Sequence, residues 1–92
     1  MVRTVRVRIH GRVQGVGYRA YIVEEAERLG PDGWVRNRRD GTVEAVFSAD
    51  GETIDQMIAT CRQGPRSAIV ERIDVEDEAQ RPASGFRVLS TS

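Results

Sequence analysis

Residues 4–10 alternate strictly between apolar and polar side chains, a pattern that places every apolar one on the same face of a β-strand. Val5, Val7 and Ile9 occupy that face, and the opposite face carries arginines. The chain therefore begins with a half-buried strand, and the order of the elements that follow decides which fold it belongs to.

Two later segments have the spacing of amphipathic helices. The first is expected over residues 18–29, with the apolar positions Ile22, Ala26 and Leu29. The second is expected over residues 53–62, whose apolar positions fall at i, i+3, i+4 and i+7, namely Ile54, Met57, Ile58 and Cys61. A glycine-proline pair follows each segment and ends the helix there.

Further strands are expected over residues 33–37, 42–47, 68–76 and 85–89. The Asp40-Gly41 pair between the first two favours a tight hairpin. In the third, Val70 and Ile73 lie three positions apart, so that a bulge near Glu71-Arg72 is needed to bring both onto one face.

The elements therefore follow the order βαββαβ, with a short extra strand at the end. Right-handed crossovers place both helices on one face of a mostly antiparallel sheet, which is the ferredoxin-like α+β sandwich. A chain of 92 residues suffices for one modest core, so we expect residues 1–92 to form a single domain.

The chain has one cysteine, Cys61, and one histidine, His10. A single cysteine excludes an intrachain disulfide, and the two residues together cannot supply a usual structural zinc site. Cys61 continues the apolar stripe of the second helix and is expected in the core, whereas His10 is expected to be a structural or incidental surface residue. No apolar run reaches the length of a signal peptide or a membrane span, so we expect a cytoplasmic protein without a membrane partner.

The net charge is zero but uneven along the chain. Residues 1–39 hold nine arginines against four acidic residues, and residues 40–92 hold five against ten, so the two parts carry +5 and −5. Any anionic partner is therefore expected to meet the first part. All fourteen basic residues are arginines, which excludes a phosphate-binding, Schiff-base or general-base lysine.

The loop of residues 11–19 is the strongest candidate for an anion site. Gly15 and Gly17 permit positive φ values, and such a turn directs successive backbone N–H groups toward one point at the start of a helix. Arg19 falls in the first turn of that helix, where a cation opposes the helix dipole unless an anion lies between them. A guanidinium can bind two phosphate oxygens at once. The alternative is that the glycines only make the turn and Arg19 is a solvated surface residue.

A second segment, Gly33-Trp34-Val35-Arg36-Asn37, ends in an asparagine that either shapes the hairpin or belongs to a site. Together with Gly11-Arg12-Val13-Gln14-Gly15-Val16-Gly17-Tyr18-Arg19, it resembles the two signature motifs of the acylphosphatase family. Asp40-Gly41-Thr42-Val43-Glu44-Ala45, Cys61-Arg62-Gln63-Gly64-Pro65 and the strand after them extend the resemblance over almost the whole chain.

The resemblance implies hydrolysis of acyl phosphates to a carboxylate and inorganic phosphate, without a metal ion or cofactor. By position, Arg19 corresponds to the family's phosphate-binding arginine, and Asn37 corresponds to the asparagine that orients the attacking water. The phosphate cradle corresponds to the backbone amides of Gly15, Val16, Gly17, Tyr18 and Arg19. Tyr18 departs from a common phenylalanine and Pro31 from a common apolar residue, and neither departure touches a side chain assigned to the chemistry.

These roles agree with the chemistry of an acyl phosphate. Its leaving group is a weak base, so no strong general acid is needed, and phosphoryl transfer depends on positioning and on stabilising charge. An asparagine is not basic, so Asn37 can only place the water, and we expect the proton to pass to a phosphate oxygen of the substrate. Arg36, Arg38 and Arg39 either steer the anionic substrate or form a solvated strand face and hairpin.

Two other functions are compatible with this topology. An RNA-binding module would stack bases on aromatic side chains of the central strands, but residues 43–47 contain one aromatic side chain and the net charge is zero. A non-catalytic, phosphate-binding regulatory domain would keep the fold and the loop without turnover. We expect the freestanding enzyme, a monomer that binds an acyl phosphate and releases inorganic phosphate, with no nucleic-acid partner.

Overall fold

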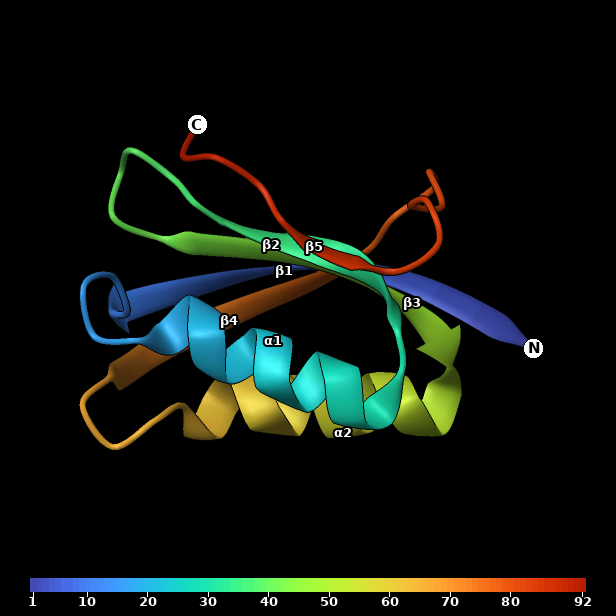
Figure 1. Cartoon of the computed structure of the whole chain (residues 1–92), viewed down its shortest axis with the longest axis horizontal. Coiled ribbons are helices and arrows are strands. Elements are labelled where there is room, and N and C mark those ends of the chain that lie inside the picture. The colour runs from blue at the N-terminus through green and yellow to red at the C-terminus, as the bar shows by residue number, and fades with distance from the viewer.

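The structure, a computed structural model, describes residues 1–92 as a five-stranded sheet with two helices (Figure 1). The strands are β1 (Val2–Arg12), β2 (Asp32–Asn37), β3 (Val43–Asp50), β4 (Ile69–Asp77) and β5 (Phe86–Val88), and the helices are α1 (Tyr18–Leu29) and α2 (Gly51–Gln63). This is the expected order βαββαβ with a short extra strand, so the ferredoxin-like α+β fold is confirmed.

The strands lie side by side in the order β4-β1-β3-β2-β5. All neighbouring pairs are antiparallel except β2 and β5, which run parallel at one edge of the sheet. The sheet is therefore mixed, with the mostly antiparallel character that the element order predicted. Both helices lie on one side of it, and the other side carries no helix (Figure 1). Neither helix combines the length and the apolar character that crossing a membrane requires.

The core fills the space between the helices and the face of the sheet that they cover. Val5, Val7 and Ile9 of β1 are fully buried there, as their alternation predicted. The rest of this cluster of fourteen buried residues consists of Val13, Tyr18, Ile22, Ala26, Val35, Val43, Ala45, Phe47, Ile54, Met57 and Cys61. Removing apolar surface from water stabilises such a core by about 25 cal/mol per Å², and this burial holds α1 and α2 against the sheet.

β4 contains the irregularity that its spacing predicted. Its pairing with β1 changes register between His10, which lies opposite Arg72, and Gly11, which lies opposite Val70. Glu71 is therefore the extra residue of a β-bulge. The expected bulge near residues 71 and 72 is confirmed.

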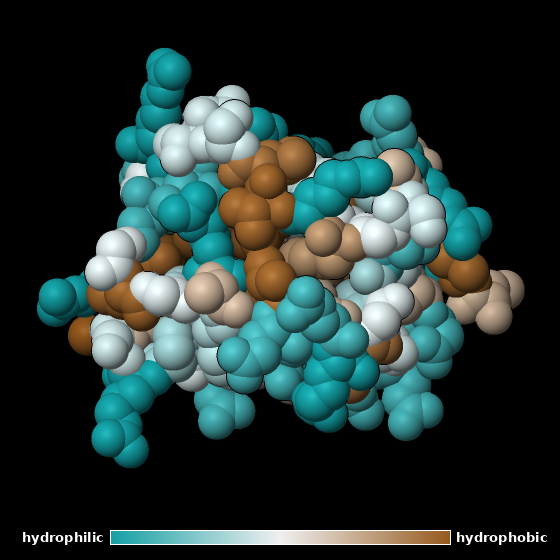
Figure 2. Space-filling view, in the orientation of Figure 1, coloured by the Kyte–Doolittle hydropathy of each residue, from teal (hydrophilic) through white to brown (hydrophobic).

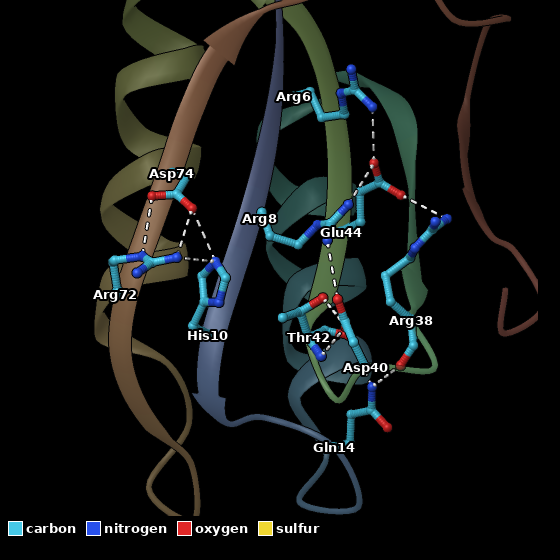
Figure 3. Close-up of polar contacts among 10 residues, drawn as sticks. All are labelled: Arg6, Arg8, His10, Gln14, Arg38, Asp40, Thr42, Glu44, Arg72 and Asp74. Atoms are coloured by element: carbon cyan, nitrogen blue, oxygen red, sulfur yellow. Dashed lines mark hydrogen bonds and ion pairs between the residues drawn. The ribbon is translucent and has the colours of Figure 1, made fainter.

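The face of the sheet without helices carries a buried carboxylate. The side chain of Glu44 on β3 is only 5% exposed, and its oxygens lie 3.3 Å from Arg6, 3.7 Å from Arg8 and 3.2 Å from Arg38 (Figure 3). A carboxylate can be buried at tolerable cost only when it is paired in this way. β3 is thus buried on both faces over its first six residues, which the sequence did not indicate.

Exposed hydrophobic surface is limited. On the face shown in Figure 1, hydrophobic side chains form a strip near the middle and smaller spots elsewhere, and hydrophilic side chains surround them (Figure 2). The large hydrophobic residues that stay exposed are Met1, Val2, Ile69, Val75 and Val88. They belong to the first two residues of the chain, to β4 and to β5, so they are scattered single residues of the kind normal on a protein surface.

Candidate active site

The loop between β1 and α1 turns on two glycines. Gly15 has a φ of 73° and Gly17 a φ of 79°, and both lie in the left-handed region that favours glycine. Gly17 is also the residue that caps the start of α1. The positive φ values that the sequence predicted are therefore present, and they bring the backbone round to the first turn of the helix.

The N–H groups of this loop have no partner within the protein. Gly15, Val16 and Gly17 donate no backbone hydrogen bond, and the amides of Tyr18 and Arg19 are in the first helical turn, where no intrahelical acceptor exists. α1 also lacks a side-chain cap and has no acidic residue in its first turn. The positive end of the helix and a row of free N–H groups therefore meet at one place, an arrangement that binds anions.

Arg19 carries a guanidinium that the protein itself does not neutralise. Its half-buried side chain makes no ion pair and no hydrogen bond with another residue. Arg6 and Arg38, by contrast, both pair with the carboxylate of Glu44. The charge of Arg19 is thus left available beside the loop.

Arg19, the loop and the end of β2 line one hollow of about 340 Å³. Its lining residues are Val13, Gln14, Gly15, Gly17, Tyr18, Arg19, Ala20, Asn37 and Val88. The two side chains that the sequence assigned to the chemistry, Arg19 and Asn37, are therefore brought together at the start of α1. Val88, which is about half exposed on β5, forms an apolar part of the rim.

Asn37 is the last residue of β2, where it pairs with Val43 of β3. Its backbone carbonyl accepts a hydrogen bond of 3.1 Å from the N–H of Ser92, so the chain beyond β5 also holds it in place. The residue is 9% exposed, and its Oδ1 atom is buried without a hydrogen-bond partner. Buried polar atoms are nearly always paired in folded proteins, so this oxygen can accept a hydrogen bond from a water or a ligand.

Tyr18 contributes to the hollow near its backbone, whereas its hydroxyl lies in the core. That hydroxyl donates a 2.8 Å hydrogen bond to the carbonyl of Cys61 at the end of α2. Burial, with Cys61 beside the ring, raises the pKa of the phenol well above its usual value. The hydroxyl that sets Tyr18 apart from phenylalanine is therefore satisfied between the two helices.

Gln14 is the polar residue of the hollow that the sequence did not single out. Its side-chain amide donates to the backbone carbonyls of Arg38, at 2.8 Å, and Thr42, at 2.9 Å (Figure 3). Both acceptors lie at the turn between β2 and β3. No sequence pattern could have found this contact, because the partners are 24 and 28 residues away from Gln14.

Arg36, Arg38 and Arg39 do not line the hollow. Arg36 donates from Nε to the carbonyl of Ser90 at 3.0 Å and lies over the ring of Trp34, whereas Arg38 pairs with Glu44 on the open face of the sheet. Arg39 is exposed. Steering of the substrate by these arginines stays a prediction.

His10 also lies outside the hollow. Its Nε2 atom is 3.0 Å from Asp74 of β4, on the open face of the sheet (Figure 3). The lining of the hollow contains no carboxylate, histidine or cysteine side chain, and no group of three or more such side chains is placed to hold a metal ion. The hollow can therefore bind an oxyanion through N–H donors and a guanidinium, and it can orient a water through an amide, but it offers no base that titrates near neutral pH.

Comparisons with known proteins identify the family. The family model for acylphosphatase matches residues 5–88. An acylphosphatase of Azorhizobium caulinodans is 52% identical over 92 residues, which cover 99% of each chain.

Solved structures give the same result. The structure of an acylphosphatase from Coxiella burnetii superposes with a TM-score of 0.90 at 32% identity, over 96% of this chain and 93% of that one. The crystal structure of acylphosphatase from Bacillus subtilis superposes with a TM-score of 0.89 at 29% identity, over 97% and 99%. With its fold, its loop and its sequence in agreement, the chain belongs to the acylphosphatase family, whose enzymes hydrolyse acyl phosphates.

Proposed function

We propose that the chain hydrolyses acyl phosphates in the hollow at the start of α1, without a metal ion or cofactor. The phosphate group of the substrate is bound by the backbone amides of Gly15, Val16, Gly17, Tyr18 and Arg19 and by the guanidinium of Arg19. Asn37 holds the attacking water. The products are a carboxylate and inorganic phosphate.

The observation that carries this proposal is the set of free N–H donors beside an unpaired guanidinium. Five successive amides lack a partner within the protein, and four of their residues, Gly15, Gly17, Tyr18 and Arg19, line the hollow, where no carboxylate of the protein lies; Val16 does not line it. A phosphoryl group has three equatorial oxygens whose charge must be stabilised in the transition state. Donors that are already oriented before the substrate arrives stabilise that charge without reorganising, which is usually the largest contribution to catalysis.

The role of Asn37 follows from its unpaired Oδ1 atom. A water that donates one O–H to this oxygen keeps its lone pair for attack on phosphorus. The new P–O bond forms as the bond between phosphorus and the carboxylate oxygen breaks. Because an amide cannot accept the proton, the proton passes to a phosphate oxygen of the substrate, and the carboxylate leaves with the electron pair of the broken bond.

Other features of the chain support proposals for its location, its oligomeric state and its partner. The location is the reducing cytoplasm, where a chain with one free cysteine, Cys61, needs no disulfide. Scattered exposed hydrophobic residues favour a monomer formed by one domain over residues 1–92. The zero net charge favours a small anionic substrate over nucleic acid as the partner.

Hydrolysis of benzoyl phosphate by the purified protein in excess EDTA tests the proposal. We expect turnover that EDTA does not reduce, and much slower turnover of a phosphate monoester, whose leaving group is a stronger base. Binding of inorganic phosphate without turnover of benzoyl phosphate would contradict the enzyme and leave a phosphate-binding regulatory domain. Turnover that EDTA abolishes and Mg²⁺ restores would contradict the metal-free mechanism.

A further inference from the structure

One side chain joins the two segments that build the hollow. The phosphate cradle belongs to the loop between β1 and α1, whereas Asn37 belongs to β2, and these segments come from separate parts of the chain. The side chain of Gln14 crosses from the loop to the turn that follows Asn37 (Figure 3). It is the single side-chain hydrogen-bond link between the loop and this turn.

The contact uses the full donor capacity of the Gln14 amide. A carboxamide nitrogen has two N–H groups, and here one bond of 2.8 Å goes to the carbonyl of Arg38 and one of 2.9 Å goes to the carbonyl of Thr42. Because both partners are carbonyl oxygens, only the nitrogen end of the carboxamide can face them. The orientation of the Gln14 side chain is thus fixed by its partners.

The turn that receives Gln14 is itself well defined. Arg38 donates from its N–H to the Thr42 carbonyl at 2.8 Å, and Gly41 donates to the Arg38 carbonyl at 3.1 Å. The carboxylate of Asp40 accepts hydrogen bonds from the backbone N–H and the hydroxyl of Thr42, at 2.9 and 2.6 Å. Gln14 therefore binds to a rigid structure whose first residue, Arg38, directly follows Asn37.

We propose that Gln14 is a positioning residue that fixes the Asn37 carboxamide relative to the phosphate cradle. This inference rests on the proposed function, in which water attacks phosphorus from Asn37. Each of the two segments could keep its own shape without Gln14, because the glycines set the loop and Asp40 sets the turn. The two hydrogen bonds from Gln14 to the carbonyls of Arg38 and Thr42, called the Gln14 clamp below, determine the distance between the two segments.

The consequence is a specific kinetic change. Removing the clamp leaves the free amides and Arg19 in place, so the affinity for inorganic phosphate, a product, stays within about threefold of the wild-type value. The water, however, is no longer held in line with the leaving group. Misplacing a reacting group by about 1 Å can cost on the order of 10²-fold in rate, so we expect kcat to fall by about 10- to 100-fold.

Gln14→Met tests this inference, because methionine keeps the length of the side chain and removes both donors. Gln56→Met is the matched control, because Gln56 is exposed on α2 and far from the hollow in sequence and contact. Each variant is measured for kcat on benzoyl phosphate, for the Kd of inorganic phosphate, and for thermal stability. We expect Gln14→Met alone to lower kcat, and both variants to keep the phosphate affinity.

A double-mutant cycle with Asn37→Ala separates positioning from general loosening of the structure. If Gln14 acts through Asn37, adding Gln14→Met to Asn37→Ala lowers kcat little further, because the residue being positioned is already absent. If the fold-losses in kcat of the two single variants multiplied in the double variant, the proposal would be overturned.

The separation between the loop and the turn, measured by NMR distances between backbone amides of residues 14–17 and 38–42, tests the Gln14 contact independently of turnover. We expect this separation to increase or to become variable in Gln14→Met and not in Gln56→Met. An inactive wild-type protein would refute the proposed function, whereas an unchanged separation in Gln14→Met would refute the role of Gln14.

Discussion

Arg19 is a cation at the positive end of a helix, a position that destabilises α1 until an anion lies beside it. The same repulsion between Arg19 and the helix makes the site selective for a ligand that carries negative charge. No carboxylate of the chain neutralises this guanidinium, although eight other arginines pair with acidic or backbone groups. Five further arginines are unpaired as well, but none of them lines the hollow, so Arg19 is the free guanidinium of the site. They are Arg12, Arg39, Arg62, Arg66 and Arg81.

Replacing Arg19 is expected to affect both binding and turnover. Loss of one oriented donor of developing charge costs about 10²–10³ in rate, so we expect at least that loss of kcat/KM in Arg19→Ala, with weaker binding of inorganic phosphate. Arg19→Lys keeps the charge without the two-pronged geometry and should recover only part of the loss. Steady-state kinetics on benzoyl phosphate and phosphate inhibition measure both. Wild-type phosphate affinity in Arg19→Ala would contradict the role.

Replacing Asn37 is expected to separate binding from turnover. Asn37→Ala removes the acceptor for the water but none of the donors to phosphate, so kcat should fall by about 10²–10³ while the Kd of inorganic phosphate stays nearly unchanged. Asn37→Asp keeps the shape and adds a negative charge, so it should weaken phosphate binding as well. If Asn37→Ala weakened phosphate binding and spared kcat, the water-positioning role would be wrong.

The contact between the start of α1 and the end of α2 depends on the hydroxyl of Tyr18, because Pro65 follows α2. In α2 the carbonyl of Cys61 would accept the N–H of the residue four positions later, but that residue is Pro65, which has no N–H. The hydroxyl of Tyr18 takes this place with a hydrogen bond of 2.8 Å. One contact therefore both completes α2 and fixes the start of α1, next to the phosphate cradle.

Tyr18→Phe is expected to lower the free energy of unfolding by about 1–3 kcal/mol, because the Cys61 carbonyl loses the hydroxyl that donates a hydrogen bond to it. Tyr21→Phe is the matched control, since its acceptor, the Thr60 carbonyl, also receives the N–H of Gly64 at 3.1 Å. We expect a smaller loss in the control. Urea unfolding measures both, and equal losses in the two variants would contradict the explanation.

Periodicity predicted the elements better than their burial. The strict alternation of β1, the stripe of α2 and the odd spacing in β4 each depend on neighbours in sequence, and the strand, the helix and the bulge at Glu71 are confirmed. The burial of Glu44 depends on arginines from β1 and from the β2–β3 turn, so no local pattern indicates it. The Gln14 contacts were missed because their partners are also distant in sequence. The positive φ values at Gly15 and Gly17 were predictable, because glycine itself favours them.

In the molecule as a whole, folding pairs much of the charge that is uneven along the sequence. Arg3 and Arg6 from the positive part lie 3.8 and 3.7 Å from Asp77 and Glu76 of the negative part. Antiparallel pairing of β1 with β4 brings these residues together. Much of the charge of the positive part is therefore neutralised, and of its unpaired arginines, Arg12, Arg19 and Arg39, only Arg19 lines the hollow.

Stability at high pH is expected to depend on groups of the core. Burial raises the pKa of the Cys61 thiol from 9.0 to about 12, and burial also raises the pKa of Tyr18. The folded protein thus keeps a proton on Cys61 that the unfolded chain loses above pH 9. The contribution of this group to the free energy of unfolding is therefore fully present below pH 9 and is lost progressively between pH 9 and about 12. Urea midpoints across this range measure the fall. Cys61→Ala should begin from a lower stability and fall less steeply just above pH 9, and an identical slope would contradict the assignment.

The most direct test of the mechanism is hydrolysis of benzoyl phosphate in ¹⁸O-labelled water with excess EDTA, followed by mass analysis of both products. In the proposed mechanism, water held by Asn37 against a phosphate bound in the cradle attacks phosphorus, so the label should appear in inorganic phosphate and be absent from benzoate. Label in benzoate would mean attack at the carbonyl carbon, away from the donors around Arg19, and would contradict the proposed arrangement of water and phosphate.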